Sequence, residues 1–202
     1  MIDDVDRTVE ALLREGLPPE VVDQVSISFA APDSQFPPAA VTLPAIDLFL
    51  YDVRENAELR EPEWTVVEAV DGSVTRTRAP VRVDLSYLVT AWASGSSTAP
   101  ALDEHRLLGE TVRALLRHRT VPAELLRGSL AGAELPLPTT TLQPGQLQSL
   151  GEFWQALGGK PKAAIGFTIT VAVAAGEPQE AGPRVVERVL RLHRIDVEGG
   201  AG

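Results

Sequence analysis

Cysteine is absent from the 202-residue sequence, and lysine occurs only at Lys160 and Lys162. Without cysteine the chain can form no disulfide, no thiolate metal site and no cysteine nucleophile. Histidine is scarce as well, with three residues, and no two of them have the spacing of metal ligands. The glycine motifs of nucleotide-binding loops and of serine hydrolases are also missing. The sequence therefore predicts no metal ion, no cofactor and no catalytic residue.

The sequence has fewer basic than acidic residues and no long apolar run. The formal net charge is −10, with 28 acidic against 18 basic residues, and such a surface repels phosphate backbones. The longest nearly apolar run, residues 163–175, is shorter than the about 20 residues of a membrane-spanning helix. The first residues are acidic and lack the apolar core of a secretion signal. We therefore expect a soluble cytoplasmic protein that binds neither nucleic acid nor membrane.

Alternating and near-continuous apolar residues predict several strands. The clearest is 81–93, where Val81, Leu85 and Val89 share one face. Asp71-Gly72 predicts a type I′ hairpin between two further strands. The predicted strands cover residues 24–31, 45–53, 64–70, 73–79, 81–93 and 163–175, with a less regular one at 184–197. Residues 54–64 and 176–183 are expected to be exposed connections.

Helical spacing of apolar residues predicts helices over 2–15, 103–119, 122–128 and 149–157, the last capped by Ser149. Strands and helices together predict one α+β domain over residues 1–197, in which helices pack on a mostly antiparallel (mixed) β-sheet. Residues 198–202 are expected to form a disordered C-terminal tail.

Asp103, Glu104 and His105 are the first candidate for chemistry. Consecutive helical side chains point about 100° apart, so these three cannot converge on one metal ion. Asp103 instead stands where an N-cap is expected, and Glu104 falls in the first turn, where carboxylates offset the helix dipole. We interpret the cluster as the start of a helix.

Three strand carboxylates, Asp47, Asp52 and Asp84, are the second candidate, because two of them could in principle meet as an acid/base pair. Isolated acids on solvated strand faces are much more common. Trp92 and Leu88 occupy the polar register of their strand, so either a helix or a partner covers that face, and a helix is the more common solution.

Polar residues and one tryptophan gather in the connection after residue 53. They form either a solvated loop with local ion pairs or a contact loop, since Arg and Trp are favoured interface anchors. Arginines alternate with apolar residues near the C-terminus, as in a strand that pairs with a neighbouring chain. The predicted partner-interface residues are Arg54, Glu55, Asn56, Arg60, Trp64, Arg184, Arg188, Arg191 and Arg194.

Ordered stretches over residues 1 to about 175 resemble a known family. They include LFLYDVREN (48–56), VRVDLSYLVTAWA (81–93) and FWQALGGKPKAAIGFTITVAV (153–173). These stretches are similar to the cap, or tail-terminator, proteins of phage-tail-like extracellular contractile injection systems.

The resemblance implies a tail-terminator-like fold and a structural, non-enzymatic function. Family members are understood to form a ring, expected to be a hexamer, at the end of the particle farthest from the baseplate. The ring ends polymerisation of inner tube and sheath and joins the two. The implied partners are further copies of this chain and the sheath and tube subunits. Two alternatives stay open: an adaptor that loads effectors onto the same particle, and a small hydrolase or transferase that uses the strand carboxylates.

Overall fold

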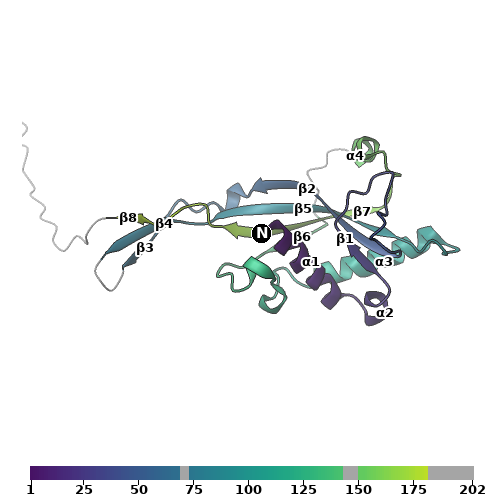
Figure 1. The fold of residues 1–202 in the computed structure, drawn as a ribbon, viewed down its shortest axis with the longest axis horizontal. Coiled ribbons are helices and arrows are strands. Elements are labelled where there is room, and N and C mark those ends of the chain that lie inside the picture. Colours follow the sequence, from purple (N-terminus) through teal and green to yellow (C-terminus); the bar gives the residue numbers. More distant parts are fainter. Residues whose placement is uncertain (69–72, 143–149, 182–202) are drawn as a thin grey trace, which may run out of the picture. The chain divides into compact units, whose positions relative to one another are not determined.

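The computed structural model describes residues 1–68, 73–142 and 150–181 (Figure 1). The chain divides into two compact units, one of Met1–Arg60 with Pro80–Val173 and one of Glu61–Ala79 with Ala174–Gly202. The predicted strand at 184–197, the tail at 198–202 and the Asp71-Gly72 turn lie outside the described residues. The single domain over 1–197 therefore stays a prediction.

A five-stranded sheet in the order β1-β2-β5-β7-β6 forms the centre of the larger unit. The three inner strands are long and antiparallel: β2 (Ala45–Glu55), β5 (Val81–Trp92) and β7 (Ala164–Val173). The two edges are three residues each: β1 (Ser26–Ser28), parallel to β2, and β6 (Thr139–Thr141), antiparallel to β7. The predicted α+β class with a mostly antiparallel, mixed sheet is confirmed.

One face of this sheet carries the main core. Ile46 and Leu48 of β2 and Leu85 of β5 are fully buried there. Two helices supply the other half of the core: α1 (Ile2–Gly16), which buries Val5, Val9, Leu12 and Leu13, and α3 (Pro100–Leu116), which buries Leu107 and Leu115. Burial of each such side chain contributes about 1.5–3 kcal/mol to folding. Because these apolar residues recur every 3.6 residues along each helix, their spacing in the sequence predicted both helices.

The two helices approach each other closely at one glycine. A Cβ added at Gly16 would lie 2.8 Å from the Cβ of Ala114, which is nearer than real side chains come. The last turn of α1 therefore needs glycine so that α1 can lie against α3. The short α2 (Pro19–Val22) follows directly after.

The start of α1 is tied to a distant loop. Asp4 accepts hydrogen bonds from the backbone N–H of Ser129 (3.1 Å) and from its hydroxyl (2.7 Å). These bonds, the hydroxyl's first, lower the pKa of Asp4 to about 2. Ser129 belongs to the 3₁₀ turn Gly128–Leu130, which the sequence did not predict.

The predicted α-helix over 122–128 is wrong, because the 3₁₀ turn Ala123–Leu125 forms after Pro122 instead.

The opposite face of the sheet is covered by α4 (Leu150–Leu157) and by the connection that follows β1 (Figure 1). Phe153 of α4 contacts Phe49 of β2, with ring centroids 6.0 Å apart. Phe36 of the connection contacts Trp92, with centroids 4.2 Å apart. The expectation that a helix covers this face is confirmed where α4 packs on it, whereas an irregular segment covers Trp92. Gly158 ends α4 at φ 65°, as predicted, whereas Ser149 lies outside the described residues.

The smaller unit contains a three-stranded antiparallel sheet in the order β3-β4-β8. The strands are β3 (Trp64–Glu68), β4 (Val74–Arg78) and β8 (Gln179–Glu180). The predicted hairpin is confirmed in its strands, whereas residues 176–183, expected to be only a turn, contribute β8. Val66 and Val67 of β3 are 62% and 56% exposed, so both faces of this strand present an apolar side chain.

Candidate functional site

The predicted contact loop is more ordered than the sequence suggested. Arg54 and Glu55 belong to β2 rather than to a loop. The guanidinium of Arg54 donates to Asp52 at 2.6 Å, and Arg60 holds both oxygens of Glu55 at 2.7 Å. These pairs are exposed to solvent, so they contribute little to folding.

Asn56 has a structural role in the same segment. Its side-chain oxygen accepts from the backbone N–H of Leu59 at 3.1 Å and so caps the 3₁₀ turn Ala57–Leu59. Its amide nitrogen lies 3.1 and 3.2 Å from the two oxygens of Asp84, which also accepts from Thr170 at 2.6 Å. Asn56 therefore anchors the end of β2 to β5 and β7.

Trp64 lies in the smaller unit, at the start of β3. Two cations of the adjacent strand face its ring, with Arg76 4.6 Å and Arg78 5.1 Å from the ring centroid. Cation–π pairs at exposed sites contribute about 0.5–1 kcal/mol. The four C-terminal arginines predicted as interface residues, Arg184, Arg188, Arg191 and Arg194, lie outside the described residues. Their role stays a prediction.

The three strand carboxylates do not form one site. Asp52 pairs with Arg54, and Asp84 is bound by Asn56 and Thr170. Asp47 lies five residues along β2 from Asp52, about 16 Å away at the rise of a strand. Asp52 and Asp84 each have a structural partner of their own, so they do not form an acid/base pair with each other.

Asp47 is unusual among these acids because it is fully buried. Neither of its carboxylate oxygens accepts a hydrogen bond from any residue that the structure describes. Desolvation raises the pKa of Asp47 to about 7, and the nearby polar groups of Ser28 and Ala30 lower it only in part. Sequence analysis took Asp47 for an acid on a solvated strand face, because the segment that covers it comes from elsewhere in the chain.

The Asp103-Glu104-His105 cluster does begin a helix, but not as predicted. Helix α3 starts at Pro100 with Ala99 at the N-cap, so Asp103 is in the first turn and not the cap. Asp103 accepts from the hydroxyl of Ser97 at 2.6 Å. Glu104 pairs with Lys162 at 2.6 Å, joining α3 to the segment before β7. The misassignment arose because proline favours the first helical position, three residues earlier.

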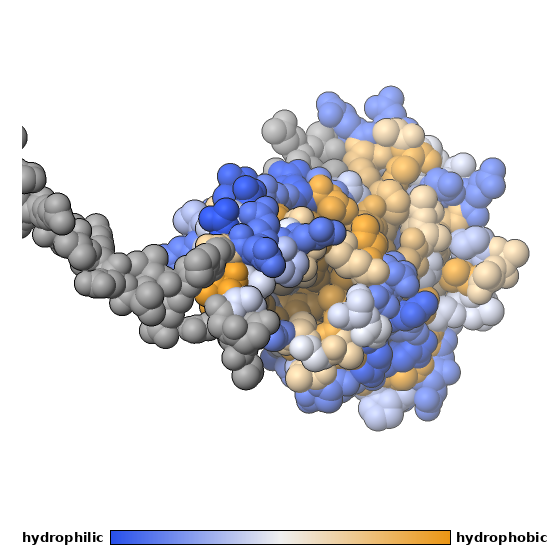
Figure 2. All heavy atoms as spheres, turned by 60° about the vertical axis from the view of Figure 1, so that its left-hand side comes forward, coloured by the Kyte–Doolittle hydropathy of each residue, from blue (hydrophilic) through white to orange (hydrophobic). Residues whose placement is uncertain are grey.

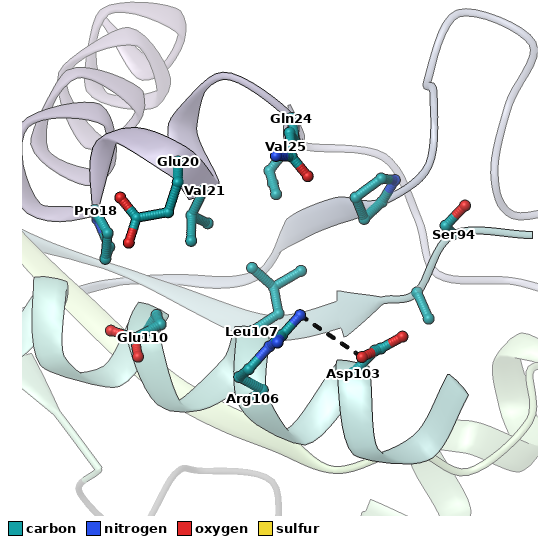
Figure 3. Close-up of a pocket in the computed structure, with 12 residues that line it drawn as sticks. Pro18, Glu20, Val21, Gln24, Val25, Ser94, Asp103, Arg106, Leu107 and Glu110 are labelled. Atoms are coloured by element: carbon teal, nitrogen blue, oxygen red, sulfur yellow. Dashed lines mark ion pairs between the residues drawn. The ribbon is translucent and has the colours of Figure 1, made fainter. Parts of the chain in front are cut away.

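A groove lies between α2 and α3, which sequence analysis did not anticipate (Figure 3). It has a volume of about 500 Å³, and its apolar lining includes Val21, Val25 and Leu107. Glu20 of α2 and Glu110 of α3 lie toward one end, and the ion pair of Asp103 with Arg106 lies toward the other (Figure 3). The walls are far apart in sequence, so no local pattern could reveal the groove.

A second hollow, of about 420 Å³, lies along the exposed side of α1. Its lining is mostly basic: Arg7, Arg14 and Arg127, with Glu10 and Ala11 between them. This is a local positive surface on a chain whose net charge is −10. On the face drawn in Figure 2, hydrophobic residues gather in patches that lie between patches of hydrophilic residues.

Two kinds of site are missing from the described part of the chain. No three His, Asp or Glu residues there are grouped as a metal ion would require. No helix in residues 1–68, 73–142 and 150–181 is long and apolar enough to cross a membrane.

Comparison with known proteins gives a family and a fold. The model of the Pvc16 N-terminal domain family matches residues 4–188. The chain resembles the sheath/tube terminator of the PVC extracellular contractile injection system in its extended state, with a TM-score of 0.64 and 23% identity over 96% of this chain and 64% of that one. It also resembles the anti-feeding prophage cap, a tube-terminating cap, with a TM-score of 0.64 and 24% identity over 95% and 61%. The chain thus spans less than two thirds of either structure. No curated protein matches it.

Proposed function

The chain belongs to the Pvc16 N-terminal domain family, and we propose that it is a cap, or tail terminator, of a contractile injection particle. In this proposal copies of the chain assemble in the cytoplasm into a ring, a hexamer, at the end of the particle. The ring joins the last layer of sheath to the inner tube and stops further addition of either. The observation that carries the proposal is the match of nearly the whole chain to a sheath/tube terminator and to a tube-terminating cap.

The smaller unit supports a role in binding partners. Strand β3 is an edge of its sheet, and its two exposed valines point to opposite faces. Exposed apolar strand edges are avoided in proteins that act alone, because they pair with other chains. We propose that β3, together with Trp64, contacts a sheath or tube subunit. We further propose partner contacts for the arginines at 184, 188, 191 and 194 and, on the larger unit, for Arg54, Glu55, Asn56 and Arg60.

The proposed function needs no catalysis. The strand carboxylates that an enzyme would use are separated or bonded to structural partners, as described above. We therefore propose that the chain acts by assembly alone. An effector-loading adaptor is the competing possibility, and it would bind a cargo protein rather than sheath and tube.

The test is the length distribution of the particles in the source strain with and without this gene, measured by electron microscopy. A terminator predicts that its loss removes particles or makes their lengths long and scattered. Re-expression of the full chain should restore uniform lengths, which controls for effects on neighbouring genes. Particles of unchanged length that lack only a cargo protein would refute the cap and establish the adaptor.

Deletion of residues 184–202 tests the C-terminal part of the interface. The truncated chain should keep the thermal unfolding of the full chain but fail to restore particle length. Unfolding on deletion would contradict the proposal, because the segment would then be an internal part of the fold.

A further inference from the structure

We propose that the α2–α3 groove of one copy receives the arginine-bearing side of α1 from the next copy in the ring. The inference depends on the proposed ring and identifies the two surfaces that build it. It follows from the two hollows described above, one net negative and one net positive, on the same unit of the chain.

The groove offers an apolar floor with negative charge around it. Its lining has three carboxylates, Glu20, Asp103 and Glu110, and one guanidinium, Arg106. Asp103 pairs with Arg106, and Glu110 pairs with Arg113 outside the lining. Glu20 is exposed and has no ion-pair partner among the residues that the structure describes. Such a groove fits an apolar or small-residue surface that carries cations at its margins.

The exposed side of α1 has this chemistry. Arg7 and Arg14 stand seven residues apart, which is about two helical turns or 10 Å along the axis. Ala11 lies between them, and Arg127 extends the positive surface from outside the helix. Arg7 has 65% of its side chain accessible and lies 3.6 Å from Asp3 and 3.7 Å from Asp4. Arg14 pairs with Glu10 at 2.9 Å. Such exposed pairs are weak, so both arginines can exchange their partners on contact with another copy.

The spacing of the two helices matches residue by residue. On α1 the series Arg7, Ala11 and Arg14 has intervals of four and three, and on α3 Asp103, Leu107 and Glu110 has the same intervals. Both series span about 10 Å along one side of a helix. With the helices side by side, each arginine meets a carboxylate, and the small Ala11 lies against the larger Leu107.

A second copy of this chain is the partner that fits, because each copy carries both halves of the contact. The two halves are different surfaces, so their pairing is head-to-tail, which is the kind of contact that closes into rings. The overall charge of −10 makes copies repel each other. Local pairing of opposite charges at the contact would offset this repulsion.

Charge reversal with rescue tests the pairing in the full chain. The Arg7→Glu/Arg14→Glu variant and the Asp103→Arg/Glu110→Arg variant should each raise the concentration for half-assembly about 100-fold, measured by analytical ultracentrifugation. The combined variant carries all four reversals and should recover assembly to within about tenfold of the wild type.

The matched control for the arginine variant is Arg117→Glu/Arg119→Glu, which makes the same change in net charge as Arg7→Glu/Arg14→Glu at exposed positions outside both hollows. It should assemble like the wild type. Equal loss in this control would show that net charge alone is responsible and would overturn the proposed contact.

Crosslinking covers the case in which the ring forms only at the end of a particle. The chain has no cysteine, so Ala11→Cys/Gln24→Cys places the only two thiols, one in each hollow. In isolated particles, a short bis-maleimide should join copies of the chain into a ladder that ends at the closed ring. Either single variant alone should give none.

The outcomes separate this inference from the proposed function. An intact ring that neither charge reversal disturbs nor crosslinking traps would overturn the surfaces but leave the cap in place. Crosslinks from the groove to sheath or tube subunits would also overturn the second copy as occupant. A chain that never self-associates, alone or at the particle end, would overturn both.

Discussion

The buried carboxyl of Asp47 makes stability depend on pH in a predictable direction. In the folded chain its pKa is about 7, whereas the ordinary value is 3.8. The unfolded chain releases this proton at lower pH than the folded chain does. Between these two values the folded state therefore holds more protons, and the free energy of unfolding must fall as pH rises. The loss begins near pH 4 and levels off above pH 7.

The size of the effect follows from the two pKa values. From pH 5 to pH 8 the loss amounts to about 2.5 kcal/mol, and about 4 kcal/mol is lost in total once Asp47 is ionised in the folded chain. Asp47→Asn keeps the shape of the side chain and cannot ionise. The variant should match the wild type near pH 3, exceed it by about 1.5–2 kcal/mol at pH 5 and exceed it by about 4 kcal/mol at pH 8.

Urea unfolding of both proteins at a series of pH values measures this difference. Other groups titrate in the same range, but their contributions cancel when the variant is subtracted from the wild type. The exposed Asp23→Asn serves as the control for the change from carboxylate to amide itself. A constant difference between Asp47→Asn and the wild type would refute the reasoning, because Asp47 would then be solvated or paired.

Three further predictions concern packing, a helix end and the partner surface. Gly16→Val should lower the free energy of unfolding by about 1–3 kcal/mol in chemical denaturation, because its side chain would collide with Ala114; an unchanged value would mean that α1 and α3 can move apart. Ser129→Ala should raise the pKa of Asp4 from about 2, so the variant should lose less stability than the wild type as pH falls from 4 to 2; equal acid sensitivity in thermal melts would contradict this. Trp64→Ala should change the free energy of unfolding by less than about 1 kcal/mol yet reduce co-sedimentation with particles, and full binding would remove Trp64 from the proposed interface.

Local patterns were sufficient for the parts of the fold that repeat. The alternation in β5 and the helical stripe of α1 gave their limits to within one or two residues of the structure. Strand β6 was missed because its three threonines lie within a proline-broken segment and show no alternation of apolar and polar residues. The cover of Trp92 by Phe36 depends on a contact across more than fifty residues, which no window of sequence contains.

The candidate surfaces were harder to predict than the fold. Sequence reasoning selected residues by type, and it found the polar segment of Arg54 and Arg60, whose charges turn out to be paired locally. It did not find the α2–α3 groove or the basic side of α1, because both depend on which helices lie together. Only the matched spacing of Arg7 and Arg14 with Asp103 and Glu110 was visible in the sequence, and it acquires meaning once these residues are seen to line hollows.

The short edge strands of the five-stranded sheet limit the addition of further strands from other chains. A long edge strand has unpaired backbone groups that can bind a further strand. Each added strand has the same unpaired groups on its outer side, so fibres can extend without limit. Here β1 and β6 end the sheet after three residues each, while its inner strands have ten or more. The proposed cap would stop one polymer, and edges of this length give incoming strands too few backbone groups to begin another.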